Sequence, residues 1–387
     1  MKAIYKTPLR VVLNSLRHYQ QIEAGIEETD GLNFFPENTV GTVGETTLYT
    51  LRFNPKVQTL LALYDLAMDG GIDTGEAIVR YSLFHAALEM DEYDQAQAHL
   101  DAFRRELTRL GLSALSEDER EEIRARVLMQ LYFLLFHESF HFILHRDPDN
   151  RGVAFDTTCQ LLLDIKAELE DGLSLVTEEE LLNHPKTRRQ IENLIPWELP
   201  EDERREMEEN LREMLAANPI RPDYIDRVLQ HERSQVEEIT CDRQAWLNLL
   251  PVFQGEGATA EDILQIHLCM FIVFNAMDFN KFLLSQYVPS LHGKMEYDGM
   301  RVVLRHKAFK TLLRQYSPEV YKLLKSEYLN LNNGLGAVYR SAVMMLYRHA
   351  DDLARLYAKH EKGGSCPDFA EIMRLERELS EATDLLF

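Results

Sequence analysis

The sequence predicts a mainly α-helical protein with a small β element. Several long segments contain no glycine or proline and repeat apolar residues at helical spacing. Only residues 40–53 give a good strand signal: they combine threonine, valine and aromatic residues with two glycines, which is typical of a β-hairpin or two short strands. No internal repeat or low-complexity tract is visible, and the turn-rich breaks are too short to be disordered linkers.

The best-defined helix is predicted over residues 116–145. Ser116 and Glu119 fit a capping box at its start. Apolar residues then recur at helical spacing without an intervening glycine or proline: Val127, Leu128, Leu131, Leu134 and Leu135. Pro148 and Gly152 follow, and they predict that the helix ends near residue 146.

A second strong helix is framed by Pro222 and Pro251 and carries an apolar stripe between them. The segment 200–217 is also predicted to be helical, but it is mostly charged and is expected to be a solvated face. Further helices are expected at residues 8–24, 55–68, 92–110, 156–169, 260–286, 318–329, 337–360 and 368–382.

Composition and charge restrict the classes of function. The 387 residues are 45% hydrophobic and 27% charged, as in a soluble protein of two or three domains or of one domain with large insertions. There are 42 Lys and Arg residues against 64 Asp and Glu residues, which gives a net charge of −22. Nucleic acid is therefore not expected as a main partner, because binding to phosphates depends on clustered cations.

The chain is expected to be cytoplasmic. The best candidate for a membrane span, residues 263–288, is interrupted by Asp278 and Lys281, so no membrane partner is predicted. The first residues lack the apolar core of a signal peptide. Four scattered cysteines without a CxxC pair suit a reducing compartment.

The segment with the clearest chemical meaning is His137-Glu138-Ser-Phe-His141, an HExxH pattern on the first predicted helix. Residues four apart lie on one face of a helix, so both imidazoles can reach one metal ion. Glu138 lies about 100° round the helix, where it can reach a water ligand of the metal without binding the metal itself. The alternative is a pair of surface or core histidines without a metal.

A catalytic zinc ion needs at least one more protein ligand. His145 is a poor candidate, because His137 and His145 lie about 12 Å apart along the helix axis. Glu238 and Asp242, four apart on the second helix, would repel each other on a bare helix. The repulsion is relieved if Glu238 binds the cation and Asp242 accepts a hydrogen bond from a ligating histidine. The alternative is two solvated acids on an acidic protein.

The HExxH pattern followed by Ser234, Glu238 and Asp242 resembles the gluzincin metallopeptidases of the CAAX-prenyl-protease and HtpX type. It is also similar to soluble ImmA/IrrE-type and phage-exclusion peptidases. The resemblance implies that His137, His141 and Glu238 bind zinc, that Glu138 is the general base, and that Asp242 orients a ligand. Cys241 stands where the family usually has alanine, and we expect it to be a small buried residue.

The resemblance also implies a zincin-like catalytic core over residues 116–310, with a helical insertion over about 156–221. An N-terminal helical region with the β-hairpin (1–115) and a C-terminal helical region (311–387) would flank this core. A fainter similarity covers His292 followed by Arg301 and by Arg305-His306. It implies that a histidine or arginine of this segment, with His292 and Arg301 as the candidates, stabilises the oxyanion or orients the aspartate. The insertion is expected to cover or shape the cleft.

The sequence thus predicts a zinc-dependent endopeptidase that acts on a specific protein or peptide substrate. Zinc would lower the pKa of its water ligand toward about 7, and Glu138 would accept the proton and pass it to the leaving amine. An edge strand from residues 40–53 could align the peptide. The main alternative is a helical interaction protein with an inactive or structural zinc site, and a third possibility is a hydrolase of non-peptide amides.

Overall fold

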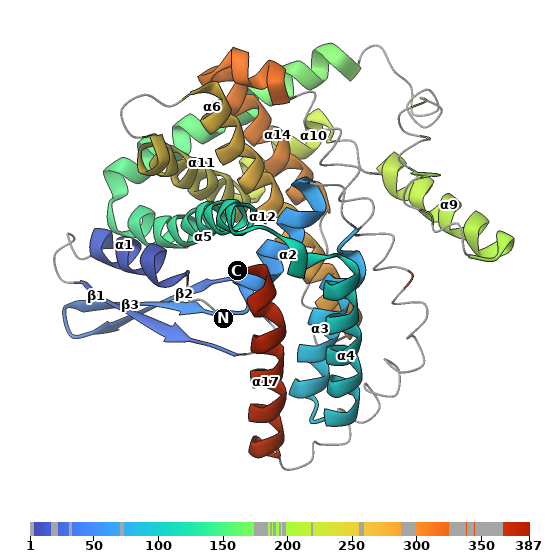
Figure 1. Cartoon of the computed structure of the whole chain (residues 1–387). Coiled ribbons are helices and arrows are strands. Elements are labelled where there is room, and N and C mark those ends of the chain that lie inside the picture. The colour runs from blue at the N-terminus through green and yellow to red at the C-terminus, as the bar shows by residue number, and fades with distance from the viewer. Residues whose placement is uncertain are drawn as a thin grey trace.

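A computed structural model describes residues 4–16, 22–30, 33–69, 73–173, 199–217, 220–254, 259–287, 299–324 and 367–387, together with single positions between 185 and 195 and at 338 and 344. The protein is mainly α-helical with one small sheet, which confirms the predicted class (Figure 1). The helices that frame the structure are α1 (Lys6–Leu16), α2 (Val57–Asp69), α3 (Gly75–Glu89), α4 (Tyr93–Arg109), α5 (Glu117–Arg146), α6 (Pro148–Leu173), α9 (Glu201–Ala217), α10 (Pro222–His231), α11 (Arg233–Gln254), α12 (Ala260–Tyr287), α14 (Gly299–Tyr316) and α17 (Phe369–Thr383).

The predicted β-hairpin is confirmed. Strands β2 (Glu37–Val43) and β3 (Thr46–Phe53) pair antiparallel. Gly44 in the turn has a φ of 62°, a left-handed conformation that glycine adopts without steric cost. The strand order is β1-β3-β2, so β2 is one edge of the sheet.

The sheet has a third strand that was not predicted. Strand β1 (Ile22–Glu28) pairs parallel with β3. The helix predicted over residues 8–24 is therefore wrong at its end, because α1 stops at Leu16 and residues 22–24 belong to β1. Apolar Ile22, Ala24 and Ile26 alternate with other residues there, which is the strand period.

Helix α5 begins and ends as predicted. The Ser116 hydroxyl accepts a hydrogen bond from the Glu119 amide, and the Glu119 carboxylate accepts one from the Ser116 amide, which completes the capping box. Helix α6 begins only two residues after α5 ends, because Pro148 fits the first position of a helix, where no backbone donor is needed. The predicted start at residue 156 was too late.

The helix predicted between Pro222 and Pro251 is two helices. Helices α10 and α11 are separated at Glu232, whose φ of −113° and ψ of 60° are not helical. Pro251 lies inside α11 instead of ending it. A proline in the last turn removes one backbone hydrogen bond and leaves the preceding turns intact, so α11 extends to Gln254.

The other helix predictions are confirmed within a few residues for α2, α4, α9, α12 and α17. Helices α3 and α14 were not predicted. Helix α3 is buried on nearly all sides, from Gly75 to Leu88, so it lacks the polar stripe that marks a surface helix. Within the predicted helix 318–329, the described residues 318–324 are helical, and most of the segment 337–360 lies outside the described residues.

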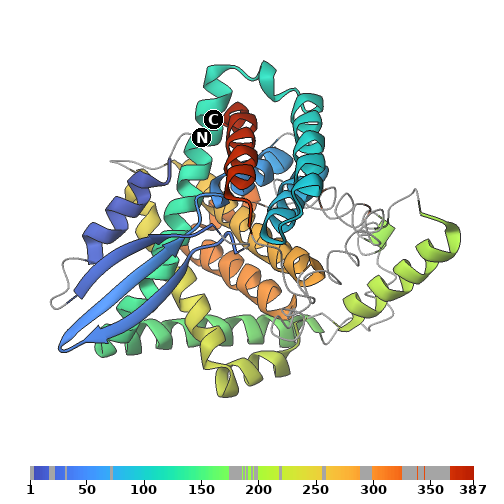
Figure 2. The ribbon, with the colours of Figure 1, turned by 90° about the horizontal axis from the view of Figure 1, so that it is seen from below.

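One large hydrophobic core joins the two ends of the chain. It contains residues of the sheet, of α1 to α5, of α11 and α12, and of α17, among them Val12, Tyr49, Trp246 and Leu375. The three regions predicted from the sequence therefore share a core. A second cluster joins α6, α10, α11 and α14, so α6 supports α11 directly. Within the predicted insertion, α9 lies at the periphery of the molecule (Figures 1 and 2).

Helices α5 and α12 are long and apolar enough to cross a membrane by length and mean hydropathy alone. In this fold, 67% of the apolar window of α5 and 72% of that of α12 are buried inside the protein. Their apolar side chains are thus largely covered by neighbouring helices. A cytoplasmic location and the absence of a membrane partner stay predictions.

Candidate metal centre

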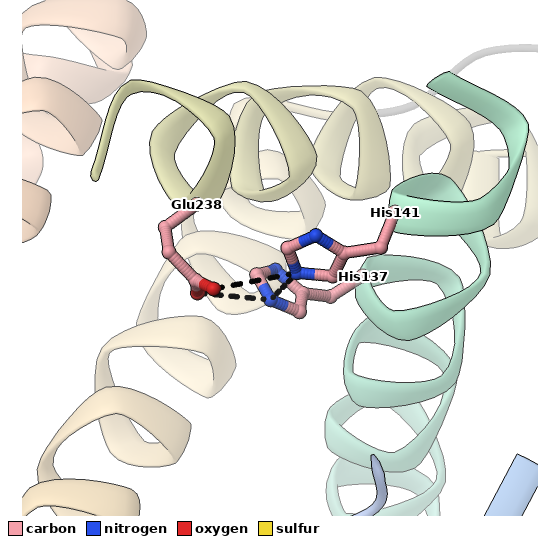
Figure 3. A group of neighbouring side chains, drawn as sticks. All are labelled: His137, His141 and Glu238. Carbon is pink, nitrogen blue, oxygen red and sulfur yellow. Dashed lines mark hydrogen bonds and ion pairs between the residues drawn. The ribbon is translucent and has the colours of Figure 1, made fainter. Parts of the chain in front are cut away.

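Two helices that are distant in sequence bring together three side chains of types that can bind a metal ion. His137 and His141 project from one face of α5, and Glu238 projects toward them from α11 (Figure 3). One donor atom from each residue lies within 4.8 Å of the other two. This group could hold a metal ion.

The separations between the donor atoms match a single coordination sphere. The two Nε2 atoms are 3.2 Å apart. Glu238 places Oε2 3.3 Å from Nε2 of His137 and Oε1 3.4 Å from Nε2 of His141. Ligands bound to a tetrahedral ion at about 2.0–2.1 Å are themselves about 3.3–3.4 Å apart. The two imidazoles, and each imidazole with its nearer carboxylate oxygen of Glu238, therefore have separations that are compatible with a bound metal ion.

Both imidazoles are oriented from behind by carboxylates of α11. Nδ1 of His137 lies 2.8 Å from Oδ1 of the fully buried Asp242. Nδ1 of His141 donates to Oε1 of Glu237 at 3.1 Å. Such contacts keep the proton on Nδ1 and leave Nε2 as the metal-binding atom. The position predicted for Asp242 matches this geometry, and Glu237 performs the same task for the second histidine.

Arg305 on α14 balances the charge of this cluster. Its guanidinium donates two hydrogen bonds to Asp242, at 2.7 and 2.6 Å, and Nη1 lies 3.6 Å from Oε2 of Glu238. The guanidinium also lies over the ring of Phe274, 4.7 Å from its centroid. Burial by itself raises the pKa of Asp242, but Arg305 and His137 outweigh it and lower this pKa, so Asp242 stays ionised.

The cluster is built to hold positive charge between the two helices. Burial alone lowers the pKa of His137, yet the carboxylates of Asp242 and Glu238 outweigh it and raise this pKa to about 10. Burial likewise opposes ionisation of Glu238, but His137 and Arg305 lower its pKa below the usual value. The metal-free site therefore favours a proton on His137, and a bound cation would take the place of that proton.

Glu138 lies beside the three donors without belonging to them. Its carboxylate oxygen Oε2 accepts a hydrogen bond of 2.7 Å from Nδ2 of Asn38 on β2. Burial raises the pKa of Glu138, while His137, His141 and the Asn38 hydrogen bond act in the opposite direction. A carboxylate with a raised pKa next to a metal site is well suited to accept a proton near neutral pH.

The remaining predicted residues are placed as follows. His292 lies outside the described residues. Arg301 is half-exposed and its guanidinium lies 3.6 Å from Glu232, whereas the arginine that contacts Asp242 is Arg305, one helical turn later. His145 is exposed and its Nε2 lies 3.1 Å from Glu237, so it stands behind His141 and outside the donor group.

Cys241 is fully buried against Leu144 and Ala154. Burial, followed by the surrounding carboxylates, raises the pKa of its thiol well above the usual value. The side chain therefore remains a protonated, small apolar group, in agreement with the expectation from the sequence.

Two residues of the site escaped the sequence analysis, Asn38 and Glu237, and Arg305 was named there in the segment after the second motif while the role was assigned to His292 and Arg301. A signal existed for Glu237, because two ligating histidines require two acceptors and only Asp242 had been assigned. Arg305 follows Arg301 by one turn on a helix that was not predicted. Asn38 is brought to the site only by the docking of β2 on α5, which leaves no local signal.

No protein-family model, curated protein or solved structure matches this chain.

Proposed function

We propose that this protein is a zinc-dependent endopeptidase. The observation that carries the proposal is the convergence of His137, His141 and Glu238 on one point, with Glu138 beside them and outside the donor group. A purely structural metal site has no use for a carboxylate held in that place.

Zinc is the metal that the donors suit best. Two imidazole nitrogens and one carboxylate are the protein ligands of many catalytic zinc sites, whereas structural zinc sites are closed by four ligands, usually including cysteine. Cys241 is three residues from Glu238, but it packs into an apolar cluster with Leu144 and Ala154. A zinc ion supplies the polarisation of a carbonyl group and the activation of water.

The protein's own groups supply the proton transfer. Glu138 would accept a proton from the attacking water and return it to the leaving amine. Asp242 and Glu237 would hold the two imidazoles with Nε2 directed inward, and their contacts of 2.8 and 3.1 Å with the Nδ1 atoms support this role. Arg305 would keep Asp242 ionised through its paired hydrogen bonds.

Strand β2 supports a peptide as the substrate. It is an edge of the sheet, six of its seven residues are exposed, and Asn38 connects it to Glu138. An extended peptide that adds to this edge as a further strand would pass the base and the metal site. This supports a peptide bond as the bond that is cleaved.

The test begins with metal content. Protein purified without chelator should contain about one zinc per chain, and Glu238→Ala should lose it. Glu232→Ala is the matched control, because Glu232 precedes the same helix and pairs with Arg227 and Arg301 instead of the histidines. A wild-type protein that takes up no zinc after supplementation would overturn the proposal.

The second step is digestion of a peptide library by the zinc-loaded protein and by Glu138→Gln. Glu138→Gln should keep its zinc and lose at least about a hundredfold in cleavage rate, since general-base catalysis contributes that much or more. A zinc-loaded wild type that cleaves no peptide would favour a hydrolase of non-peptide amides or a helical interaction protein with a structural zinc.

A further inference from the structure

Asn38 holds the base at two points. Its Nδ2 lies 2.7 Å from Oε2 of Glu138 and 3.4 Å from the main-chain oxygen of the same residue. An asparagine amide group carries two N–H donors, so one side chain can serve both acceptors. The carboxylate is thereby fixed relative to its own backbone as well as to the strand.

The strand position of Asn38 explains why it reaches the helix. Asn38 is opposite Leu51 in the β2–β3 register, and residues directly opposite each other in an antiparallel pair share a face. Leu51 is fully buried, so this is the face that packs on α5. Glu37 and Thr39, on either side of Asn38, are exposed. Asn38 is thus the inward-facing residue that links the edge strand to the metal-site helix.

The sheet confines the base from a second strand. Tyr49 on β3 is fully buried, and its ring lies 4.9 Å from that of Phe142, one turn after Glu138 on α5. Burial raises the pKa of Tyr49, and the negative charge of Glu138 raises it further. The turn of α5 that carries Glu138 is thus held to β2 by Asn38 and to β3 by the contact between Phe142 and Tyr49.

We propose that Asn38 is a positioning residue that couples the peptide-binding edge of the sheet to the base Glu138. This inference rests on the proposed peptidase function. A peptide that pairs with β2 orders the strand, and the strand carries the amide that aligns the carboxylate. Both side-chain hydrogen bonds described for Asn38 go to Glu138, which lies outside the donor group, so removal of Asn38 should disturb the base and spare the metal.

The experiment compares Asn38→Ala, Asn38→Asp and Asn38→Gln with wild type. Aspartate has nearly the shape of asparagine but repels Glu138, whereas glutamine keeps the donor on a longer stem. Asn150→Ala is the matched control, because Nδ2 of Asn150 donates to the carboxylate of Asp147 at 2.6 Å, at an exposed site beyond the end of α5.

Three quantities are measured: zinc affinity by chelator competition, kcat and KM on a peptide from the library, and the affinity of acetohydroxamate for cobalt-substituted protein. Hydroxamate binding is followed by visible absorption, and it reports on Glu138 without turnover because the ligand's N–O–H group needs a nearby acceptor. Glu138→Gln should weaken it and provides the reference.

Asn38→Ala and Asn38→Asp should bind zinc with an affinity within about threefold of wild type. Their kcat should fall by about 10–100-fold with KM little changed, because a small displacement of a catalytic group costs up to about a hundredfold in rate. They should also show part of the loss of hydroxamate affinity that is expected for Glu138→Gln. Asn38→Gln should recover part of both losses. Asn150→Ala should behave as wild type.

Wild-type kcat and hydroxamate affinity in Asn38→Ala would overturn the inference, as would equal losses in Asn150→Ala. A wild type that cleaves no peptide would count against the peptidase function. The hydroxamate titration would then still test the role of Asn38. If Glu138→Gln binds hydroxamate more weakly but Asn38→Ala binds it as wild type does, the proposed positioning of Glu138 by Asn38 is refuted. The absence of any defect in Glu138→Gln would refute both proposals.

Discussion

The replacement of Asp242 by asparagine tests whether the contacts behind the histidines control the metal site. Oδ1 of Asp242 lies 2.8 Å from Nδ1 of His137 and accepts a hydrogen bond from Nη2 of Arg305, and Oδ2 accepts one from Nε of Arg305. An asparagine offers one oxygen, so its amide group must face one of these donors in either orientation. In the better orientation the asparagine oxygen takes the place of Oδ1, and the NH2 group takes the place of Oδ2. The NH2 group then faces another donor, Nε of Arg305, which lies 2.7 Å from Oδ2 in the wild-type protein.

Two effects of Asp242→Asn have different sizes. Loss of a carboxylate behind a ligating histidine typically weakens metal affinity by about 10–100-fold, or about 1.4–2.7 kcal/mol. A buried arginine that loses its charged partner costs about 3–5 kcal/mol of folding stability. Glu238, 3.6 Å from the guanidinium of Arg305, retains part of the pairing in the metal-free protein. The expected loss of stability is therefore near the lower end of that range.

Zinc affinity is measured by chelator competition near pH 7.5 on protein shown to be folded by circular dichroism, and stability by urea unfolding of the metal-free form. Asp226→Asn is the matched control, because Asp226 pairs with Lys166 at 2.7 Å on the surface and should change neither quantity noticeably. A zinc dissociation constant for folded Asp242→Asn within threefold of wild type would refute the role of Asp242.

Three further predictions concern the same cluster. Glu237→Gln should weaken zinc binding by about tenfold, because His141 loses its charged acceptor; calorimetry that gives the wild-type affinity would contradict this. Arg305→Ala should destabilise the metal-free protein and weaken zinc binding, whereas Arg301→Ala should do neither, as thermal unfolding with and without zinc will show. The pKa of His137 is about 10 in the folded protein and about 6.5 in the unfolded chain. The resulting contribution to the stability of the metal-free protein is fully present below pH 6.5 and is lost as the pH rises through 10. Zinc displaces that proton, so titrations in buffers of different ionisation enthalpy should show proton release per zinc at pH 7.5 and an affinity that rises by up to about tenfold per pH unit.

The sequence predicts those residues of the site that are spaced so as to lie on one face of a single helix. His137 with His141, and Glu238 with Asp242, are four residues apart, so each pair shares a helix face in any fold that forms these helices. The residues whose contacts in the site were not assigned from the sequence depend on the docking of separate elements. Asn38 needs β2 to lie on α5, and Arg305 needs α14 to lie beside α11.

The same holds for the fold: elements with a clear local sequence signal were predicted, and elements without one were missed. Helix α5 has a capping box, an apolar face and a proline after its end, and both of its limits were predicted. Helix α3 is buried almost all round and therefore lacks the polar–apolar period on which the prediction depends. Strand β1 has a strand period, but it is short and follows α1 closely, so a single helix was assigned to both.

The wide spacing of the site along the chain has a consequence for the nascent protein. His141 and Glu237 are 96 residues apart, and Asp242 and Arg305 are a further 63 apart. Arg305 follows His141 by 305 − 141 = 164 residues, so at about 5–20 residues per second roughly 8–33 seconds separate the synthesis of the histidine pair from that of the arginine that completes the cluster. Until α14 has been made, Asp242 and Glu238 of α11 lack the guanidinium of Arg305 that balances their charge. An incomplete chain on the ribosome therefore cannot form the whole centre, which would delay any hydrolytic activity until most of the molecule exists.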